Sequence, residues 1–192
     1  MSTQTLAADP TAIPPTPTAP TKEDIVAWVT NSTNEVFSTM LGMEATAVDH
    51  FVEEPGKGLS MGVIGIIGLV GDWTGTAVVN CSSPLACQIA NTLFMSEYAS
   101  VTDEVLDAIA EMTNMIIGNL KNHLEERLGQ MGLSIPAVVF GRNFATRRSG
   151  KESWYVMNFL VNGEKFEVQL CLAPNQNGVL TGSGVPRIMS IA

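Results

Sequence analysis

Positively charged residues are scarce in this sequence. Lys and Arg together number 10 against 19 Asp and Glu, which leaves a net charge of −9 at pH 7. A protein that binds nucleic acid needs a basic surface for the phosphate backbone. The basic residues cluster at Arg142, Arg147, Arg148 and Lys151, which we interpret as a solvated loop. The charge balance therefore argues against a nucleic-acid partner.

Cysteine and histidine are also rare, and neither type is spaced for metal binding or nucleophilic catalysis. The 3 cysteines, Cys81, Cys87 and Cys171, form no CxxC pair and leave an odd count, which is typical of reduced thiols packed as small apolar residues. His50 and His123 are far apart in the sequence, and His123 lies towards the apolar side of a predicted helix. We therefore expect no metal site and no cofactor of the protein's own.

Long hydrophobic runs and targeting signals are missing too. The most apolar stretch, residues 61–70, is short and is interrupted by three glycines, well below the length of a membrane span. Residues 1–21 contain five prolines among Thr and Ala, with no basic residue and no signal-like apolar core. We expect no membrane association, a cytoplasmic protein, and a disordered Pro/Thr-rich tail over residues 1–21.

The remainder of the sequence is typical of one globular domain. The chain has 192 residues, 45% of them hydrophobic and 15% charged, enough to bury a substantial core. We predict a single folded domain over residues 22–173. Beyond it, residues 174–192 carry only weak signals and are expected to form a loosely ordered C-terminal segment.

Hydrophobic periodicity and turn residues predict three helices and several hairpin-joined strands, an α+β architecture around an antiparallel sheet. The helix-like segments are residues 21–42, 83–95 and 101–128. The strand-like segments are residues 43–53, 60–70, 74–80, 135–142, 154–161 and 166–172, with turns expected at residues 55–58, 71–72 and 162–163.

The helix expected over residues 101–128 carries a polar stripe opposite its apolar face. At about 100° per residue, Asp107, Glu111 and Asn114 fall within one narrow stripe, which Gly118 extends by a turn. A stripe of this kind is usually just a solvated face. This one lacks the Lys at i+4 that solvated faces tend to use, and its mid-helix Gly suggests close approach by another molecule.

The order Asp107-x3-Glu111-x2-Asn114, followed after a long gap by Pro136, resembles the signature of the CheC/CheX/FliY family of bacterial chemotaxis phosphatases. The gap before Pro136 is one residue shorter than the family pattern. The resemblance extends over about residues 22–172, and the single motif copy is more similar to CheX than to the two-site CheC. It implies a sheet of about six antiparallel strands with the motif helix outside it, and a homodimer.

The resemblance also implies roles for these residues. Asn114 would position the water that attacks the aspartyl-phosphate of a CheY-type response regulator, and Glu111 would dock the receiver's Lys. Asp107, Gly118 and Pro136 would contact the partner, which would supply its own Mg²⁺. The residue chemistry is compatible, because a carboxamide both accepts a hydrogen bond from water and donates one to a phosphoryl oxygen without changing charge.

Other interpretations remain open at this stage. The same stripe could hold a receiver or flagellar switch component without hydrolysis, or the chain could be a structural dimer whose tail recruits a partner. Asp107 and Glu111 could also act as paired carboxylates. Asn31, Glu35 and Ser38 repeat the motif spacing in the first helix, but the hydroxyl of Ser38 cannot replace both hydrogen-bonding arms of a carboxamide.

Overall fold

The computed structural model describes most of the predicted domain. The two segments predicted to be a disordered tail and a loosely ordered C-terminal segment lie largely outside the described residues. So does the first half of the turn expected at residues 55–58, whose last two residues were wrongly predicted, because they belong to a strand. The described residues are 19–53, 57–147, 152–175 and 187–189.

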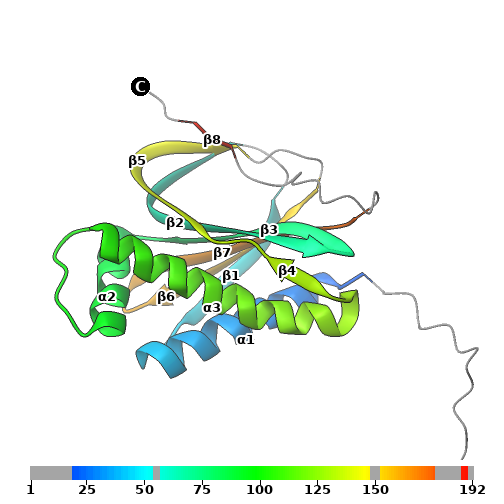
Figure 1. Cartoon of the computed structure of the whole chain (residues 1–192), viewed down its shortest axis with the longest axis horizontal. Helices are drawn as coiled ribbons and strands as arrows, with labels where there is room; N and C mark the ends of the chain where they lie inside the picture. Colours follow the sequence, from blue (N-terminus) through cyan, green and yellow to red (C-terminus); the bar gives the residue numbers. More distant parts are fainter. Residues whose placement is uncertain (1–18, 54–56, 148–151, 176–186, 190–192) are drawn as a thin grey trace, which may run out of the picture.

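Within these residues the chain forms three α-helices, one π-helical turn and eight strands, which confirms the α+β prediction (Figure 1). In chain order the elements are α1 (Lys22–Val36), η1 (Phe37–Leu41), β1 (Thr46–Glu53), β2 (Lys57–Gly71), β3 (Trp73–Cys81), α2 (Ser83–Phe94), α3 (Asp103–Leu128), β4 (Met131–Leu133), β5 (Ala137–Arg147), β6 (Trp154–Val161), β7 (Glu164–Pro174) and β8 (Arg187–Met189).

All eight strands belong to one antiparallel sheet with the order β1-β6-β7-β3-β2-β5-β8, and β4 pairs with β2 beside β5. Six of them are the long strands expected from the sequence. The other two, β4 and β8, have 3 residues each and were not predicted. The interpretation of the basic cluster as a loop was wrong for Arg142 and Arg147, because both belong to β5.

Element ends differ from the predictions by a few residues. The motif helix begins at Asp103 rather than at residue 101, and the first strand begins at Thr46 rather than at residue 43. The strand expected from Ile135 begins at Ala137, because Pro136 lacks the N–H that a strand ladder needs. These shifts leave the side-chain stripe of the motif helix unchanged.

Local sequence signals explain where the elements begin and end. Thr21 and Asp24 form a reciprocal capping box at the start of α1, and Gly42 ends the helical segment in the left-handed conformation with a φ of 60°. Between β6 and β7, Asn162 and Gly163 have φ values of 51° and 81°, as a tight hairpin turn requires. These signals were readable in the sequence.

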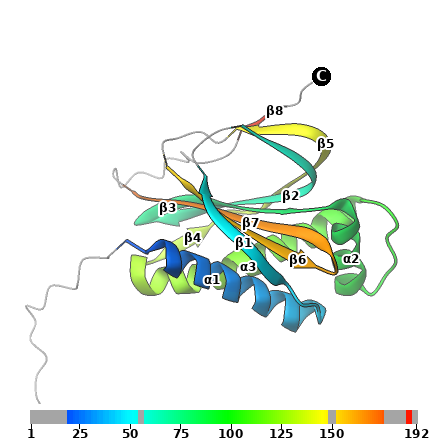
Figure 2. The same ribbon diagram turned by 180° about the vertical axis from the view of Figure 1, so that it is seen from behind.

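The three helices lie on one face of the sheet, whereas β2 and β5 curve away on the other side (Figures 1 and 2). The main hydrophobic core lies between this helical layer and the sheet. A second, small cluster on the other face contains Ile64, Val78 and Trp154. The motif helix α3 is central to the layer, because it packs against α1, α2 and β2.

The rare residue types take structural places in this fold. All three cysteines are buried, and none of them forms a disulfide bond. Burial raises the pKa of the Cys81 thiol to about 12, which leaves it protonated and unreactive at neutral pH. The ring of His123 stacks on that of Trp28 with 6.4 Å between ring centroids, as suits a side chain predicted towards the apolar side of its helix. None of the described helices is long and apolar enough to span a membrane.

Candidate functional site

One face of α3 is completely embedded in the protein. Val105, Ile109, Met112, Ile116 and Leu120 each have no measurable exposure to solvent. Burial of large side chains on every turn fixes both the position and the rotation of the helix. The opposite face of α3 is therefore held in a defined orientation.

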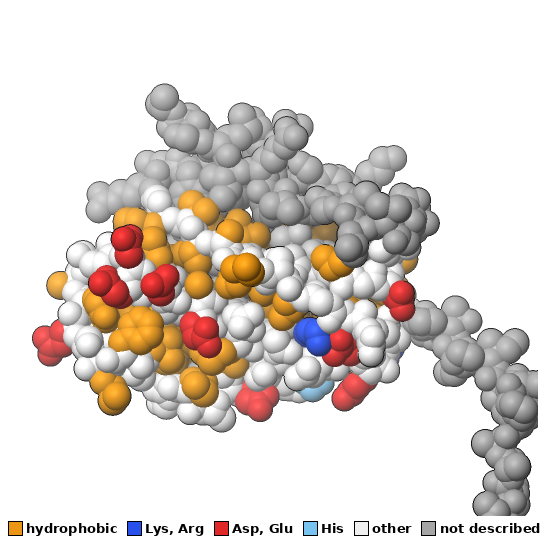
Figure 3. Space-filling model, viewed as in Figure 1, with side chains coloured by type: hydrophobic (Ala, Val, Ile, Leu, Met, Phe, Trp, Pro, Cys, Tyr) orange, Lys and Arg blue, Asp and Glu red, His pale blue; other side chains and the backbone are white. Residues whose placement is uncertain are grey.

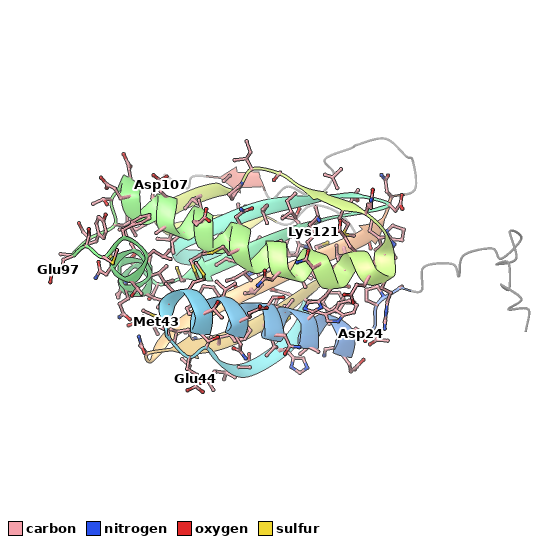
Figure 4. The ribbon with its side chains drawn as sticks, turned by 60° about the horizontal axis from the view of Figure 1, so that its bottom comes forward. Asp24, Met43, Glu44, Glu97, Asp107 and Lys121 are labelled. Atoms are coloured by element: carbon pink, nitrogen blue, oxygen red, sulfur yellow. The ribbon has the colours of Figure 1, made fainter. Side chains whose placement is uncertain are left out.

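The polar stripe lies on that opposite face, as predicted. Asp107, Glu111 and Asn114 are all exposed. Their side chains form no hydrogen bond or ion pair with any other described residue. In Figure 4, Asp107 points away from α1. A rigid helix thus presents two carboxylates and a carboxamide with unused hydrogen-bonding capacity.

The other half of α3 is bound tightly to α1. The amide of Asn119 donates a hydrogen bond of 3.3 Å to Glu35, and Arg127 forms an ion pair with Asp24. The guanidinium of Arg127 also lies 5.4 Å from the ring centroid of Trp28. The polar groups in the second half of α3 therefore stabilise the fold. Those of the stripe, in the first half, form no such contacts with the described residues.

The pairing of Glu35 also bears on the second copy of the motif spacing in α1. Glu35 is engaged by Asn119, and the hydroxyl of Ser38 donates a hydrogen bond of 3.1 Å to the carbonyl of Glu35 in its own helix. Both groups are used within the protein. This geometry agrees with the prediction that Asn31, Glu35 and Ser38 do not form a second site.

A close contact between Thr113 and Gly65 sets the height of α3 above the sheet. Thr113 is fully buried, and its hydroxyl donates a hydrogen bond of 2.7 Å to the carbonyl of Ile109. A Cβ atom placed on Gly65 would lie 2.0 Å from the Thr113 hydroxyl oxygen. Only Gly can occupy this point of β2, and Asn114 is the next residue along the helix.

Sequence reasoning missed Thr113 and Gly65 as supports of the site. The available signal was a Thr on the apolar side of α3, together with a Gly within an apolar strand. Each was visible, but only the packing of α3 on β2 pairs them. Gly65 thus serves the close packing of α3 on β2.

Gly118 lies on the stripe with open space around it. A Cβ atom built on it would meet no atom of the described residues within 4 Å. The fold itself therefore gives no reason for Gly at this mid-helix position, where it costs about 1 kcal/mol relative to Ala.

Pro136 belongs to a break between β4 and β5, which both pair with the same edge of β2. At this break Ser134 is fixed to β2, because its N–H donates to the carbonyl of Gly68 and its hydroxyl accepts from the Gly68 N–H, both at 2.9 Å. The structure therefore brings Pro136 to the edge of the sheet beside β2, the strand on which α3 packs.

Acidic and hydrophobic side chains occupy the exposed surface around the first half of α3, where basic side chains are scarce (Figure 3). The described residues contain no group of three or more His, Cys, Asp or Glu side chains placed to hold a metal ion. The surface is an exposed helix face rather than an enclosed cleft.

Comparisons with known proteins agree with this geometry. The chain matches the family described as chemotaxis phosphatase CheX over residues 63–160, which is just over half of its length and includes all five predicted site residues. It is 27% identical over 132 residues to the CheY-P phosphatase CheX of Thermotoga maritima, covering 66% of this chain and 81% of the relative.

Solved structures share the fold. The chemotaxis protein CheX from Desulfovibrio desulfuricans is similar with a TM-score of 0.71 at 23% identity, covering 78% of this chain and 99% of the other. A CheX-CheY-BeF3-Mg complex from Borrelia burgdorferi is similar with a TM-score of 0.61 at 21% identity, covering 77% and 97%. Taken with the family match, the geometry of α3 leads to one conclusion: this chain belongs to the CheX family of chemotaxis phosphatases.

Proposed function

We propose that this protein hydrolyses the aspartyl-phosphate of a CheY-type response regulator, and so damps a chemotaxis or other two-component signal in the cytoplasm. The observation that carries the proposal is the pair Glu111 and Asn114, exposed one turn apart on a rigid helix and engaged by no other described residue. The names of the Thermotoga and Borrelia relatives support the choice of CheY as the substrate.

In this proposal the carboxamide of Asn114 aligns the attacking water. Its carbonyl oxygen accepts a hydrogen bond from the water, and its NH2 group donates one to a phosphoryl oxygen. The water oxygen bonds to phosphorus as the bond to the aspartyl oxygen breaks, releasing inorganic phosphate and the receiver's carboxylate. Phosphoryl transfer depends chiefly on alignment and electrostatics, so this protein needs no nucleophile of its own.

Glu111 has the docking role. Its carboxylate would form a charge-assisted contact with the receiver's Lys, one turn of helix before Asn114. Asp107 lies a further turn away and would contact the receiver surface, as would Gly118 and Pro136. Mg²⁺ bound by the receiver would offset charge on the phosphoryl group, which fits the Mg²⁺ named in the Borrelia complex.

The direct test is the decay of a CheY receiver phosphorylated with acetyl phosphate in Mg²⁺, followed with and without the full-length protein. We expect faster decay that is proportional to the concentration of this protein. Binding to the phosphorylated receiver without faster decay would favour the alternative, a non-catalytic adaptor for a receiver or flagellar switch component.

Glu111→Lys tests the assigned docking contact. We expect this variant to bind phosphorylated receiver at least tenfold more weakly, because like charges would then face each other in a partly desolvated interface. Isothermal titration with the BeF3-activated receiver measures the affinity. Glu126, exposed on the last turns of α3, offers a matched control as Glu126→Lys. Unchanged affinity in Glu111→Lys would contradict the pairing.

A homodimer is the second part of the proposal, and the exposed edge of the sheet supports it. Residues of β1 are exposed along nearly the whole strand, including Val48 at 57% and the half-exposed Phe51 and Val52. An open edge that carries apolar side chains is suited to pairing with another chain. We expect sedimentation velocity to show a dimer that Val48→Lys weakens; a monomeric native protein would contradict this.

A further inference from the structure

A large apolar side chain stands in solvent next to the candidate site. Ile135 is 91% exposed, although the backbone around it is firmly held. Ser134 is bonded to Gly68 in both directions, its hydroxyl donates a further hydrogen bond of 3.1 Å to the carbonyl of Ile135, and Pro136 restricts the backbone that follows. The protein therefore presents this isoleucine on a fixed corner rather than on a loose loop.

The register of the sheet places this corner beside the polar stripe. Gly65 lies under Thr113, and Gly71 lies close to Gln130 beyond the end of α3, so β2 and α3 run in the same direction. Ser134 bonds to Gly68, three residues beyond Gly65, or about 10 Å along the strand. That distance equals roughly seven residues of helix and brings the corner close to the turn of α3 that contains Gly118.

A second apolar side chain lies on the other side of Asn114 along the same edge. Phe140 is 44% exposed and pairs with Val63, two residues before Gly65, which places it near the turn of α3 that contains Ala110. Val138 contacts the main core beneath the helices, and side chains alternate along a strand, so Phe140 faces the helical side as well. Ile135, Pro136 and Phe140 form what we call the apolar ledge.

The stripe and the ledge together have the composition of an interface. A standard interface covers about 800 Å² on each partner, which is the area of a disc with a radius of roughly 16 Å. A disc of this size centred on Asn114 includes the ledge. The stripe supplies charge and hydrogen bonds, whereas tight binding needs apolar anchors as well. Side chains on fixed backbone lose little entropy when they bind, which suits Ile135 to this role.

We propose that the apolar ledge is the second half of the receiver-docking surface, where Ile135 packs on apolar side chains beside the receiver's phosphorylation site. This inference rests on the proposed function. The acidic stripe selects a partner whose phosphorylation site holds a cation and a Lys, and the ledge is continuous with that stripe. The ledge contributes affinity, and Asn114 contributes the chemical step.

Ile135→Ser tests the ledge separately from catalysis. In the full-length protein we expect the concentration of acetyl-phosphate-phosphorylated CheY that gives the half-maximal rate to rise about tenfold, with the maximal rate unchanged within twofold. Titration with BeF3-activated CheY should show the same loss of affinity. Because Ile135 is already exposed, the melting temperature should stay within 2 °C or so of the native value.

Met95→Ser is the matched control, because Met95 is 93% exposed and follows α2, a helix that packs on α3 and belongs to neither the stripe nor the ledge. We expect normal affinity in this variant. The docking role of the ledge would be contradicted if Ile135→Ser bound CheY with native affinity, or if both variants lost affinity equally. It would also be contradicted if Ile135→Ser changed only the oligomeric state of the protein. If the native protein did not accelerate the decay of phosphorylated CheY, the proposed function itself would be contradicted. Failure of the ledge and failure of the proposed function can therefore be distinguished.

Discussion

Replacing Asn114 with alanine should lower the maximal rate of receiver dephosphorylation by about 10²-fold, the effect typical of losing one positioning group that acts in the transition state. Affinity for the phosphorylated receiver should change little, because Glu111 and the rest of the surface remain. Single-turnover decay of phosphorylated CheY at saturating concentrations of this protein measures the rate.

Folding does not explain such a loss, since Asn114 is exposed and its side chain bonds to no other described residue. Alanine at this helix position should leave the melting temperature equal or slightly higher. Asn34→Ala, a change of the same type at an exposed position of α1, should retain the native rate. A native rate in Asn114→Ala itself would remove the catalytic assignment.

The shape of the side chain can be separated from its chemistry with Asn114→Asp. Aspartate has nearly the same shape, but it has lost the NH2 donor and carries a negative charge that faces the phosphoryl oxygens. We expect a rate at least as low as that of Asn114→Ala. A rate near the native value would mean that alignment by the carboxamide is not the source of catalysis.

Among substitutions that add one methyl group beneath the site, Gly65→Ala should cause the largest loss of stability and activity. The new Cβ would lie 2.0 Å from the hydroxyl oxygen and 3.2 Å from the methyl carbon of Thr113, which is buried and cannot swing away. Either α3 or β2 has to move. We expect the free energy of unfolding to fall by about 2–3 kcal/mol and the melting temperature by roughly 5–10 °C. Displacement of Asn114 should lower the rate at least tenfold.

Two further variants make this prediction specific. Thr113→Ala in the Gly65→Ala background removes the hydroxyl oxygen and the methyl carbon of Thr113. It leaves the Thr113 Cβ at 3.0 Å from the new methyl group, so stability and rate should recover in part. Gly118→Ala adds a methyl group to open space in the same helix and should raise stability by up to about 1 kcal/mol. Equal stability of Gly65→Ala and the native protein in urea unfolding would contradict the contact.

The parts that the sequence predicted well are those that local rules determine. The stripe was readable because α3 has 26 residues, and its buried positions recur with the helical period over the whole length. The turn at Asn162 and Gly163 was readable because few other residue pairs adopt the required backbone. In both cases a few neighbouring residues carry the complete signal.

The parts that were missed depend on contacts between distant segments. A three-residue strand such as β4 has no periodicity of its own and exists only because Gly71, Val70 and Leu69 lie beside it. The exposure of Ile135 follows from the break between β4 and β5, whereas the sequence suggested an uninterrupted strand from that residue. The pairing of Gly65 with Thr113 likewise requires knowing which strand passes beneath α3.

The attachment of α3 to α1 has a kinetic consequence for any partner. Asn119 and Arg127 hold one half of the helix, and the buried face holds the rest, so α3 has lost its conformational freedom during folding. A receiver would then meet a surface that is already in its binding geometry. Association should proceed in one step at the rates of orientation-limited encounters, about 10⁵–10⁷ M⁻¹s⁻¹, without a slower phase of rearrangement.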